Sequence, residues 1–473
     1  MGFTDVTFLF LFLPVSIILY LAAEKLFHND KINNLLIVVL SAAFYFWGNA
    51  RTFYFIVAAG LFIFLAGQSI SKAKRKKKKR RLVFTVICLA GILLFYKYVA
   101  LLCSLLNQIA NQDLITVGDI LIPVGISYIV FEAISYIADI RRKDAEAGTL
   151  LECFTFLSLF PKLVSGPIVL WKDFRSQLKN RRSDIDRITA GLDRIIIGYA
   201  KKVILADTFG SQIALINSAI AAGGVDVPTM WLRALLYFFQ LYFDFSGYSD
   251  IAIGLCGIFG FKIKENFRFP YLSKSLAEFW RRWHISLGIW FREYVYIPLG
   301  GNRRGNVYIH LLIVFVLTGL WHGTGWQFLI WGGVHGIFII IERAIRKTGW
   351  YQRIPGAVKW LLTMGIVYFA WVLFMSKDLP DAFQSYACMF SPMTTETVNF
   401  TWQYFLSGRT ILFLAIAVAG QILGIEIIRR RIMPIVETPA GDAVKRVLLL
   451  LLFAMDILYV VNSTYSPFIY FQF

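Results

Sequence analysis

The sequence predicts an all-α polytopic membrane protein, and three observations carry that prediction. The 473 residues are 58% hydrophobic and only 16% charged, whereas a soluble domain is about half apolar and about a quarter charged. The hydrophobic residues come in blocks, several of them close to the roughly 20 residues that carry a helix across about 30 Å of hydrocarbon. These blocks run continuously apolar and do not alternate, which excludes a membrane β-barrel.

The apolar blocks, taken in order, predict about 10 to 12 transmembrane helices. They are Val6–Phe27, Asn34–Trp47, Thr52–Ile70, Leu82–Leu106, Pro228–Phe245, Val307–Trp321, Trp326–Ile341, Val358–Met375, Ile411–Ile428 and Val447–Val461. The first block is long and lacks a small-residue cleavage site, so we interpret it as a retained span and not as a secretory signal. The five cysteines form no C-x-x-C pair, so we interpret them as small buried residues and not as disulfides or zinc ligands.

A basic run sets the predicted orientation. Nine of the ten residues from Lys72 to Arg81 are Lys or Arg, a large share of the net charge of +19. No soluble nucleic-acid-binding module accompanies the run, so it indicates a cytoplasmic loop that touches anionic membrane lipid, and nucleic acid is not an expected partner. Three preceding spans then place the N-terminus outside. Five further basic segments are expected inside: Arg141–Lys143, Lys172–Arg187, Lys262–Arg282, Arg343–Arg353 and Arg429–Arg446.

This orientation requires the apolar block Leu150–Leu170 to enter and leave on one face. Pro161, Gly166 and Pro167 favour such a re-entrant path, because broken helix is tolerated where protein or water covers it. The chain is therefore expected to be a multi-pass protein of the inner or plasma membrane with both termini extracytoplasmic. We expect one domain over residues 1–473, with its functional core at about 118–350, where polar and aromatic residues interrupt the apolar blocks.

Two carboxylates lie seven residues apart on the expected helix Val124–Ile140, namely Glu132 and Asp139. A charge at the bilayer centre costs at least about 2.5–3.5 kcal/mol, so each one needs a partner. We interpret Asp139 as a residue of the cytoplasmic boundary and expect Glu132 to hydrogen-bond to a neighbouring helix.

The segment Asp244-Phe-Ser246-Gly-Tyr-Ser249-Asp250 interrupts a long apolar stretch. Two carboxylates, two hydroxyls and a glycine are expected to break or widen the helix. Such a break lines a cavity in some membrane proteins, and a polar helix–helix contact is the alternative. The following Gly254-Leu-Cys-Gly-Ile-Phe-Gly260 lacks the features of a phosphate-binding loop, so we expect it to pack helices closely.

Aromatic residues and cations gather between Asn266 and Ser286, in Phe279-Trp280-Arg281-Arg282-Trp-His284 above all. An interfacial belt with snorkelling arginines is the simple interpretation. A cytoplasmic site for a polyanionic, adenine-bearing ligand also uses these residues, with arginine for phosphate and tryptophan for base stacking. Helical spacing places Trp280 and His284 on one face and pairs Glu278 with Arg281 or Arg282.

His322 is the sharpest single feature, in Gly319-Leu-Trp321-His322-Gly323-Thr-Gly325 between two apolar blocks. The glycines let backbone approach a ligand closely, and the imidazole exchanges protons near neutral pH. These properties favour a functional histidine. His335 is thirteen residues further on, roughly 20 Å along a straight helix, so no metal site is expected there.

At these residues the chain resembles bacterial membrane-bound O-acyltransferases of the alginate O-acetylation type. The resemblance covers nearly the whole chain, and its central motifs are long enough to be specific. The matching segments are Pro123–Ser127, Ser165–Ile168, Gln240–Gly254, Glu265–Phe267, Pro270–Ser275, Glu278–Leu287, Trp290–Tyr294, Tyr296–Arg303, Gly319–Gly323 and Pro467–Phe473. Aspartate is expected where Glu293 stands, and the run at 72–81 is more basic than usual.

The resemblance implies that an acetyl group from cytoplasmic acetyl-CoA, a substrate and not a bound cofactor, passes through a central tunnel. A separate extracytoplasmic protein with a Ser-His-Asp hydrolase-like fold then completes transfer to a polysaccharide hydroxyl. It implies His322 as the catalytic histidine and His284 as the second polar residue of the tunnel. Combined with the motifs above, Trp280, Arg281, Arg282 and Asn266 are expected to bind acetyl-CoA, and Asp244, Ser246, Ser249 and Trp321 to line the tunnel.

Two other functions remain open at this point. The related D-alanyl transferases of teichoic-acid modification take their acyl group from a small carrier protein. A polysaccharide transporter or flippase also has polar breaks in apolar helices. Its inverted repeats would predict two such polar segments, whereas the polar segment occurs once in this sequence.

Overall fold

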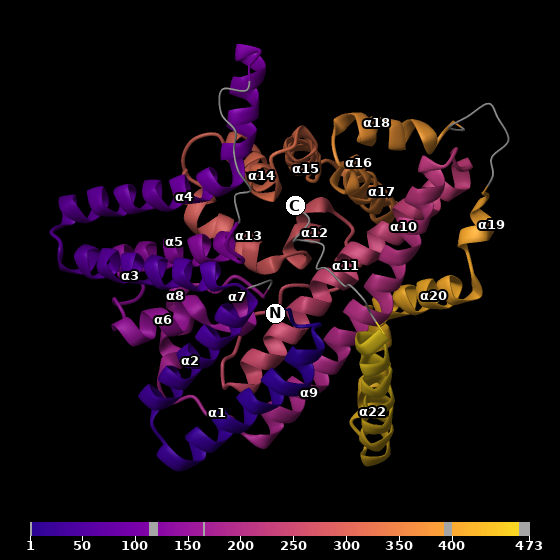
Figure 1. Cartoon of the computed structure of the whole chain (residues 1–473). Helices are drawn as coiled ribbons and strands as arrows, with labels where there is room; N and C mark the ends of the chain where they lie inside the picture. Colours follow the sequence, from indigo (N-terminus) through magenta and orange to yellow (C-terminus); the bar gives the residue numbers. More distant parts are fainter. Residues whose placement is uncertain (1, 113–121, 164–165, 392–399, 463–473) are drawn as a thin grey trace. The chain divides into compact units, whose positions relative to one another are not determined.

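The computed structural model describes residues 2–112, 122–163, 166–391 and 400–462. These residues form an all-helical chain with one isolated β-bridge, between Val225 and Phe400 (Figure 1). The predicted all-α class is therefore confirmed. Ser165 and the ending Pro467–Phe473, which contribute to the resemblance, lie outside the described residues.

The described residues divide into two compact units. The first contains residues 1–195, 249–265 and 289–295, and the second contains 196–248, 266–288 and 296–473. The helices up to the middle of the chain are α1 Leu13–Phe27, α2 Asp30–Gly48, α3 Ala50–Lys72, α4 Arg75–Ala110, α5 Ile126–Arg142, α6 Leu150–Ser158, α7 Phe160–Leu163, α8 Trp171–Phe174, α9 Ile185–Tyr199, α10 Asp207–Ala221 and α11 Val227–Ile258. They are followed by α12 Leu276–Arg282, α13 Ile285–Phe291, α14 Val307–His322, α15 Trp326–Ile345, α16 Gly349–Arg353, α17 Gly356–Met375, α18 Leu379–Cys388, α19 Trp402–Phe405, α20 Gly408–Ile422, α21 Glu426–Val436 and α22 Pro439–Asn462.

Seven of the described helices are long and apolar enough to cross a membrane, or up to eight if the bent pair α20–α21 forms one span. Three predicted blocks lie on α11, α14 and α22, which do not meet the same criteria, although α14 is a shorter apolar helix. The count of about 10 to 12 spans therefore stays a prediction. The block Leu150–Leu170 contains two short helices, α6 and α7, neither long enough to cross, which agrees with a broken path.

Four expectations about local structure were wrong, and the last of them concerns Asp244–Asp250. The basic run is not a loop, because α4 already begins at Arg75 and lysine and arginine are good helix formers. The apolar block Ile411–Ile428 is not one helix, because α20 and α21 meet at an angle of 94°. Trp280 and His284 do not share a helical face, because α12 ends at Arg282 and Trp283 is extended.

The segment Asp244–Asp250 does not break its helix, since α11 runs unbroken from Val227 to Ile258. Instead, a π-helix at Ala200–Ala206 separates α9 from α10. A Cβ added at Gly247 would lie 2.7 Å from the carbonyl oxygen of Gly198. The polar segment of α11 thus packs closely against the end of α9 and the π-helix Ala200–Ala206 that follows it.

Candidate functional site

His284 occupies a short irregular segment between α12 and α13 in the second unit. Its φ of 44° lies in the left-handed region that side chains other than glycine rarely adopt. Two backbone hydrogen bonds hold the segment, from Arg268 N to Arg282 O and from Ile285 N to Asn266 O, both 2.9 Å. The unusual backbone at His284 is therefore fixed by its neighbours.

Asn266 determines the orientation of the His284 ring. Its Oδ1 lies 3.2 Å from His284 Nδ1 and also accepts hydrogen bonds from the backbone and hydroxyl of Ser286. Because Oδ1 only accepts, Nδ1 carries the proton and Nε2 of a neutral ring presents a lone pair. Burial lowers the pKa of His284 to about 3, so the ring stays neutral near pH 7. Among the described residues, Nε2 has no hydrogen-bond partner.

His322 is the last residue of α14 and is buried. Trp321 contacts both histidines: the ring centroid of His284 is 6.1 Å from that of Trp321, and the ring centroid of His322 is 4.7 Å from it. His322 also contacts Trp331 of α15 and Phe374 of α17, each at 5.0 Å. The structure therefore brings the predicted residues His284, Trp321 and His322 together in an aromatic environment.

The glycines around His322 pack helices. A Cβ added at Gly319 would lie 2.4 Å from the Phe328 carbonyl oxygen, and one at Gly332 would lie 2.3 Å from the Phe315 carbonyl oxygen. A Cβ added at Gly323 would lie 2.3 Å from the ring of Phe328. The space beside Gly319 and Gly323 is thus filled by α15 and not left for a ligand, which corrects the expectation from the sequence. The close α14–α15 hairpin positions His322 (Figure 1).

His335 lies closer to His322 than a straight helix implies. The chain turns at Gly323–Gly325, and both imidazoles contact the Trp331 ring at 5.0 Å. The estimate of roughly 20 Å was therefore wrong. His335 is fully buried, and neither ring nitrogen has a hydrogen-bond partner among the described residues. The described part of the chain brings no three His, Cys, Asp or Glu side chains together in a way that could hold a metal ion.

The predicted donor-binding residues separate into three places. Arg281 and Arg282 line a cleft of about 1540 Å³, and Arg282 pairs with Glu278 at 2.6 Å, as the helical spacing predicted. Trp280 contacts Phe315, Trp331 and His335 instead. Asn266 is completely buried against His284.

The predicted tunnel-lining residues of α11 are all buried. Asp244 forms an ion pair of 2.7 Å with Lys202 on the π-helix, and Lys202 also contacts Asp207 at 2.6 Å. The sequence left two alternatives for Asp244, a helix break that lines a cavity and a polar helix–helix contact. The ion pair with Lys202 corresponds to the second. Ser246 and Ser249 are buried on the same helix, and the hydroxyl of Ser246 has no hydrogen-bond partner in the described residues.

The first unit holds a second buried ion pair, between Glu132 of α5 and Lys162 of α7. Val169 N also donates to Glu132, at 3.4 Å. The expectation that Glu132 hydrogen-bonds to a neighbouring helix is confirmed. In the same unit, Gly191 and Gly254 approach each other's backbone, which confirms close packing at Gly254.

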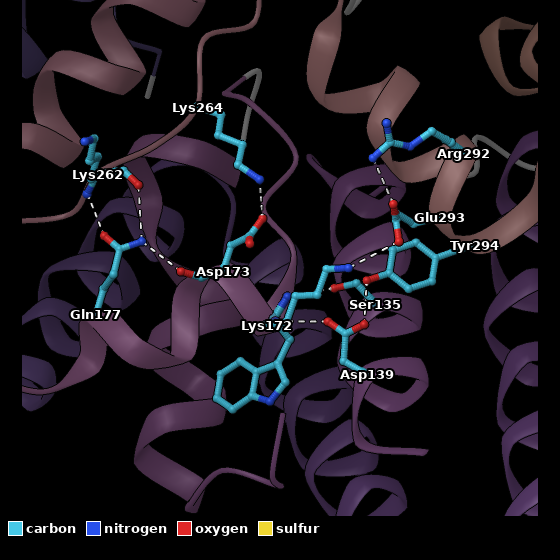
Figure 2. A network of polar contacts seen from close by, with 11 residues as sticks. Ser135, Asp139, Lys172, Asp173, Gln177, Lys262, Lys264, Arg292, Glu293 and Tyr294 are labelled. Carbon is cyan, nitrogen blue, oxygen red and sulfur yellow. Dashed lines mark hydrogen bonds and ion pairs between the residues drawn. The ribbon is translucent and has the colours of Figure 1, made fainter. Parts of the chain in front are cut away.

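A polar network connects α5, α8 and the segment after α13 (Figure 2). Asp139, interpreted from the sequence as a boundary residue while only Glu132 was expected to be buried, is itself fully buried. Its Oδ1 accepts a hydrogen bond from Tyr294 Oη at 2.7 Å, and its Oδ2 accepts one from Lys172 N at 3.0 Å. Glu293 bridges Lys172 at 3.2 Å and Arg292 at 3.0 Å. Partial burial by itself raises the pKa of Glu293, but the two cations outweigh that effect and hold the pKa below its usual range. Glu293, where aspartate was expected, is therefore an ionised bridge between two cations.

Several interacting residues were missed in the sequence. Lys162 and Lys202 each stand in an apolar stretch, and a lysine at such a position is a signal that a partner carboxylate exists. Ser286 carried no comparable signal, because a serine at the start of a helix is common.

The chain is similar to several known proteins. A model of the membrane-bound O-acyltransferase family matches residues 123–379, which include His284 and His322. The chain is 36% identical to the probable alginate O-acetylase AlgI of Pseudomonas putida, with all of both chains covered. It is 31% identical to the peptidoglycan O-acetyltransferase of Helicobacter pylori, over 80% of this chain and 78% of that protein. It is 34% identical to the teichoic acid D-alanyltransferase of Streptococcus thermophilus, over 47% of this chain and 57% of that one.

Proposed function

The chain belongs to the membrane-bound O-acyltransferase family, and from this premise we propose that it transfers acetyl groups from cytoplasmic acetyl-CoA towards an extracytoplasmic polysaccharide. The family makes the chain an O-acyltransferase, which removes the transporter alternative. The relatives aligned over the full chain are named as O-acetylases of a polysaccharide, whereas the D-alanyltransferase aligns over about half of it. The extent of these alignments favours acetyl over D-alanyl.

The observation that carries the proposal is the placement of His284 and His322 against Trp321. A hydroxyl is a weak nucleophile until a base removes its proton, and we assign that task to His322. The hydroxyl oxygen then attacks the thioester carbonyl carbon, the carbon–sulfur bond breaks, and the proton held by His322 passes to the departing CoA thiolate. The products are an acetyl ester and CoA.

His284 and its partners supply orientation. With Nδ1 bonded to Asn266, the ring directs Nε2 away from Asn266, where it can accept a hydrogen bond from a substrate group. Asn266 thus becomes a positioning residue in this account. The surrounding indole and phenyl rings exclude water, which strengthens such hydrogen bonds.

The donor is proposed to approach Arg281 and Arg282 from the cytoplasm, with their guanidinium groups contacting its phosphates. Both termini are then extracytoplasmic. An extracytoplasmic partner with a Ser-His-Asp hydrolase-like fold is proposed to receive the acetyl group before it reaches the polysaccharide.

The experiment uses the purified chain in nanodiscs with radiolabelled acetyl-CoA, acetylatable polysaccharide and candidate partner proteins, added together and singly. We expect label in the polysaccharide only when the partner is present, with release of CoA. A parallel arm supplies a D-alanyl-charged carrier protein as donor. Turnover of that donor without turnover of acetyl-CoA would overturn the proposal.

A further inference from the structure

The cleft beside α12 extends well beyond Arg281 and Arg282, the residues assigned to the acetyl donor. Its volume is about 1540 Å³, and its walls come from the start of α11, residues 268–282, α17 and the α20–α21 corner, all in the second unit. The lining positions of α17 run from Gly356 to Phe369, about 20 Å of helix. That length is comparable with one half of a hydrocarbon core of about 30 Å.

The aromatic walls present carbon to the cleft, because their polar atoms are already bonded to backbone. Tyr271 Oη donates to Phe238 O at 2.6 Å, Trp360 Nε1 to Tyr271 O at 2.8 Å, and Tyr368 Oη to Trp231 O at 2.7 Å. These walls therefore offer few hydrogen-bond partners, and hydrocarbon chains need none.

The lining also includes a positively charged group of residues. Arg268, Lys274, Arg281, Arg282 and Arg429 line the cleft with only two acids, Glu278 and Glu426. Glu278 pairs with Arg282, and Glu426 pairs with Arg430 outside the cleft. Among the described residues, the side chains of Arg268, Lys274 and Arg429 form no ion pair. An anion is therefore the complementary ligand.

The segment around the corner between α20 and α21 has features of a chain segment that lies at a membrane interface. The two helices meet at 94°, so α21 lies in the membrane plane if α20 runs along the membrane normal. Residues 426–436 combine Arg429, Arg430 and Arg431 with isoleucine, methionine and valine, the composition of an interfacial amphipathic helix. Gly424 fixes the corner, because an added Cβ there would lie 2.2 Å from the ring of Phe269.

We propose that this cleft binds an anionic phospholipid, with its acyl chains along α17 and α20 and its phosphate at Arg268, Lys274 and Arg429. The apolar length, the internally bonded aromatic walls, the excess of cations and the basic amphipathic helix α21 all fit one occupant that joins two hydrocarbon chains to a phosphate. The proposal does not depend on the acyl group or on the acceptor.

The test measures lipid retained by the purified full chain. Nanodiscs contain equal amounts of phosphatidylcholine and phosphatidylglycerol, and native mass spectrometry after extraction counts the lipids that remain bound. We expect preferential retention of phosphatidylglycerol by the parental chain and at least a tenfold loss in a variant with Arg268→Gln, Lys274→Gln and Arg429→Gln. The matched control replaces Arg346, Lys347 and Arg353 by Gln, three exposed cations that do not line the cleft, and should retain the lipid.

A second variant keeps the proposal testable if the triple variant does not fold. Gly365 lines the cleft, and an added Cβ there meets nothing within 4 Å. Gly365→Phe should fill the apolar part and displace the lipid without disturbing the helices. Equal retention of both lipids by the parental chain, unchanged retention in both cleft variants, or displacement of the lipid by inorganic phosphate would each overturn the proposal.

Discussion

The imidazoles of His284 and His322 lie against the same indole ring, with ring centroids 6.1 and 4.7 Å from that of Trp321. The two histidines come from different elements, a segment with left-handed backbone and the end of α14. Their environments also differ, because His284 Nδ1 lies 3.2 Å from Asn266 Oδ1, while the His322 ring packs against Trp331 and Phe374. This difference predicts different roles, with His322 as base and His284 as a neutral orienting group.

Asn266→Asp should make the reaction sensitive to acid. In the parental chain the pKa of His284, lowered by burial to about 3, keeps the ring neutral from pH 5 to 8. A carboxylate at position 266 favours the imidazolium and raises that pKa. Protonated Nε2 no longer accepts a hydrogen bond, so kcat/KM should fall as the pH decreases towards 5. The pH profiles of the two proteins check this, and identical profiles would contradict the role given to Asn266.

Arg281→Ala and Arg282→Ala should weaken acetyl-CoA binding, because each removes a charge-assisted contact of about 1.5–3 kcal/mol. Arg282→Ala should have the larger effect, since it also leaves Glu278 unpaired beside the incoming phosphates. Arg353→Ala is the control, an exposed arginine of α16 that does not line the cleft. Calorimetry measures all three, and parental affinity in both cleft variants would show that the donor binds elsewhere.

Gly332→Ala should separate α14 from α15. Its Cβ would lie 2.3 Å from the Phe315 carbonyl oxygen, a contact that requires the backbone to move, and overpacking of this kind costs about 1–3 kcal/mol. Gly333→Ala is a matched control one residue away, where an added Cβ meets nothing within 4 Å. We expect a lower thermal midpoint and lower activity for Gly332→Ala alone. Equal midpoints for the two variants would refute the close packing.

Asp244→Asn tests whether Asp244 supports the structure. Breaking a buried ion pair by removing one partner costs about 3–5 kcal/mol, whereas replacing both partners by apolar residues is often neutral. Asp244→Asn should therefore lower the thermal midpoint strongly, and the double variant Asp244→Leu, Lys202→Met should restore much of it. A stable but inactive Asp244→Asn would instead favour a role in the tunnel.

The sequence predicted those parts of the fold that depend on local composition. The apolar blocks at Thr52–Ile70 and Val358–Met375 correspond closely to α3 and α17, because about 20 apolar residues in membrane have no alternative to helix. The corner after α20 was missed, because it depends on a contact between Gly424 and the distant Phe269.

The sequence indicated which residues to consider for the candidate site, but it did not indicate which residues they contact. His322 was indicated by the surrounding glycines and tryptophans, and His284 by the surrounding tryptophans and arginines. The pairing of Asp244 with Lys202 and the hydrogen bond of Asn266 to His284 depend on how segments far apart in sequence meet. The glycines were interpreted as space for a ligand, because sequence alone cannot distinguish a ligand from a facing helix.

The proposed role of His322 as the general base is tested most directly by measuring acetyl transfer by His322→Ala. The variant should bind acetyl-CoA with parental affinity and lose about 10²–10⁴-fold of the transfer rate, the usual contribution of a general base. His310→Ala is the control, since His310 contacts the Gly301 carbonyl and lies outside the proposed machinery. If His322→Ala folds and transfers label from acetyl-CoA at nearly the parental rate, His322 is not the base and the account is wrong.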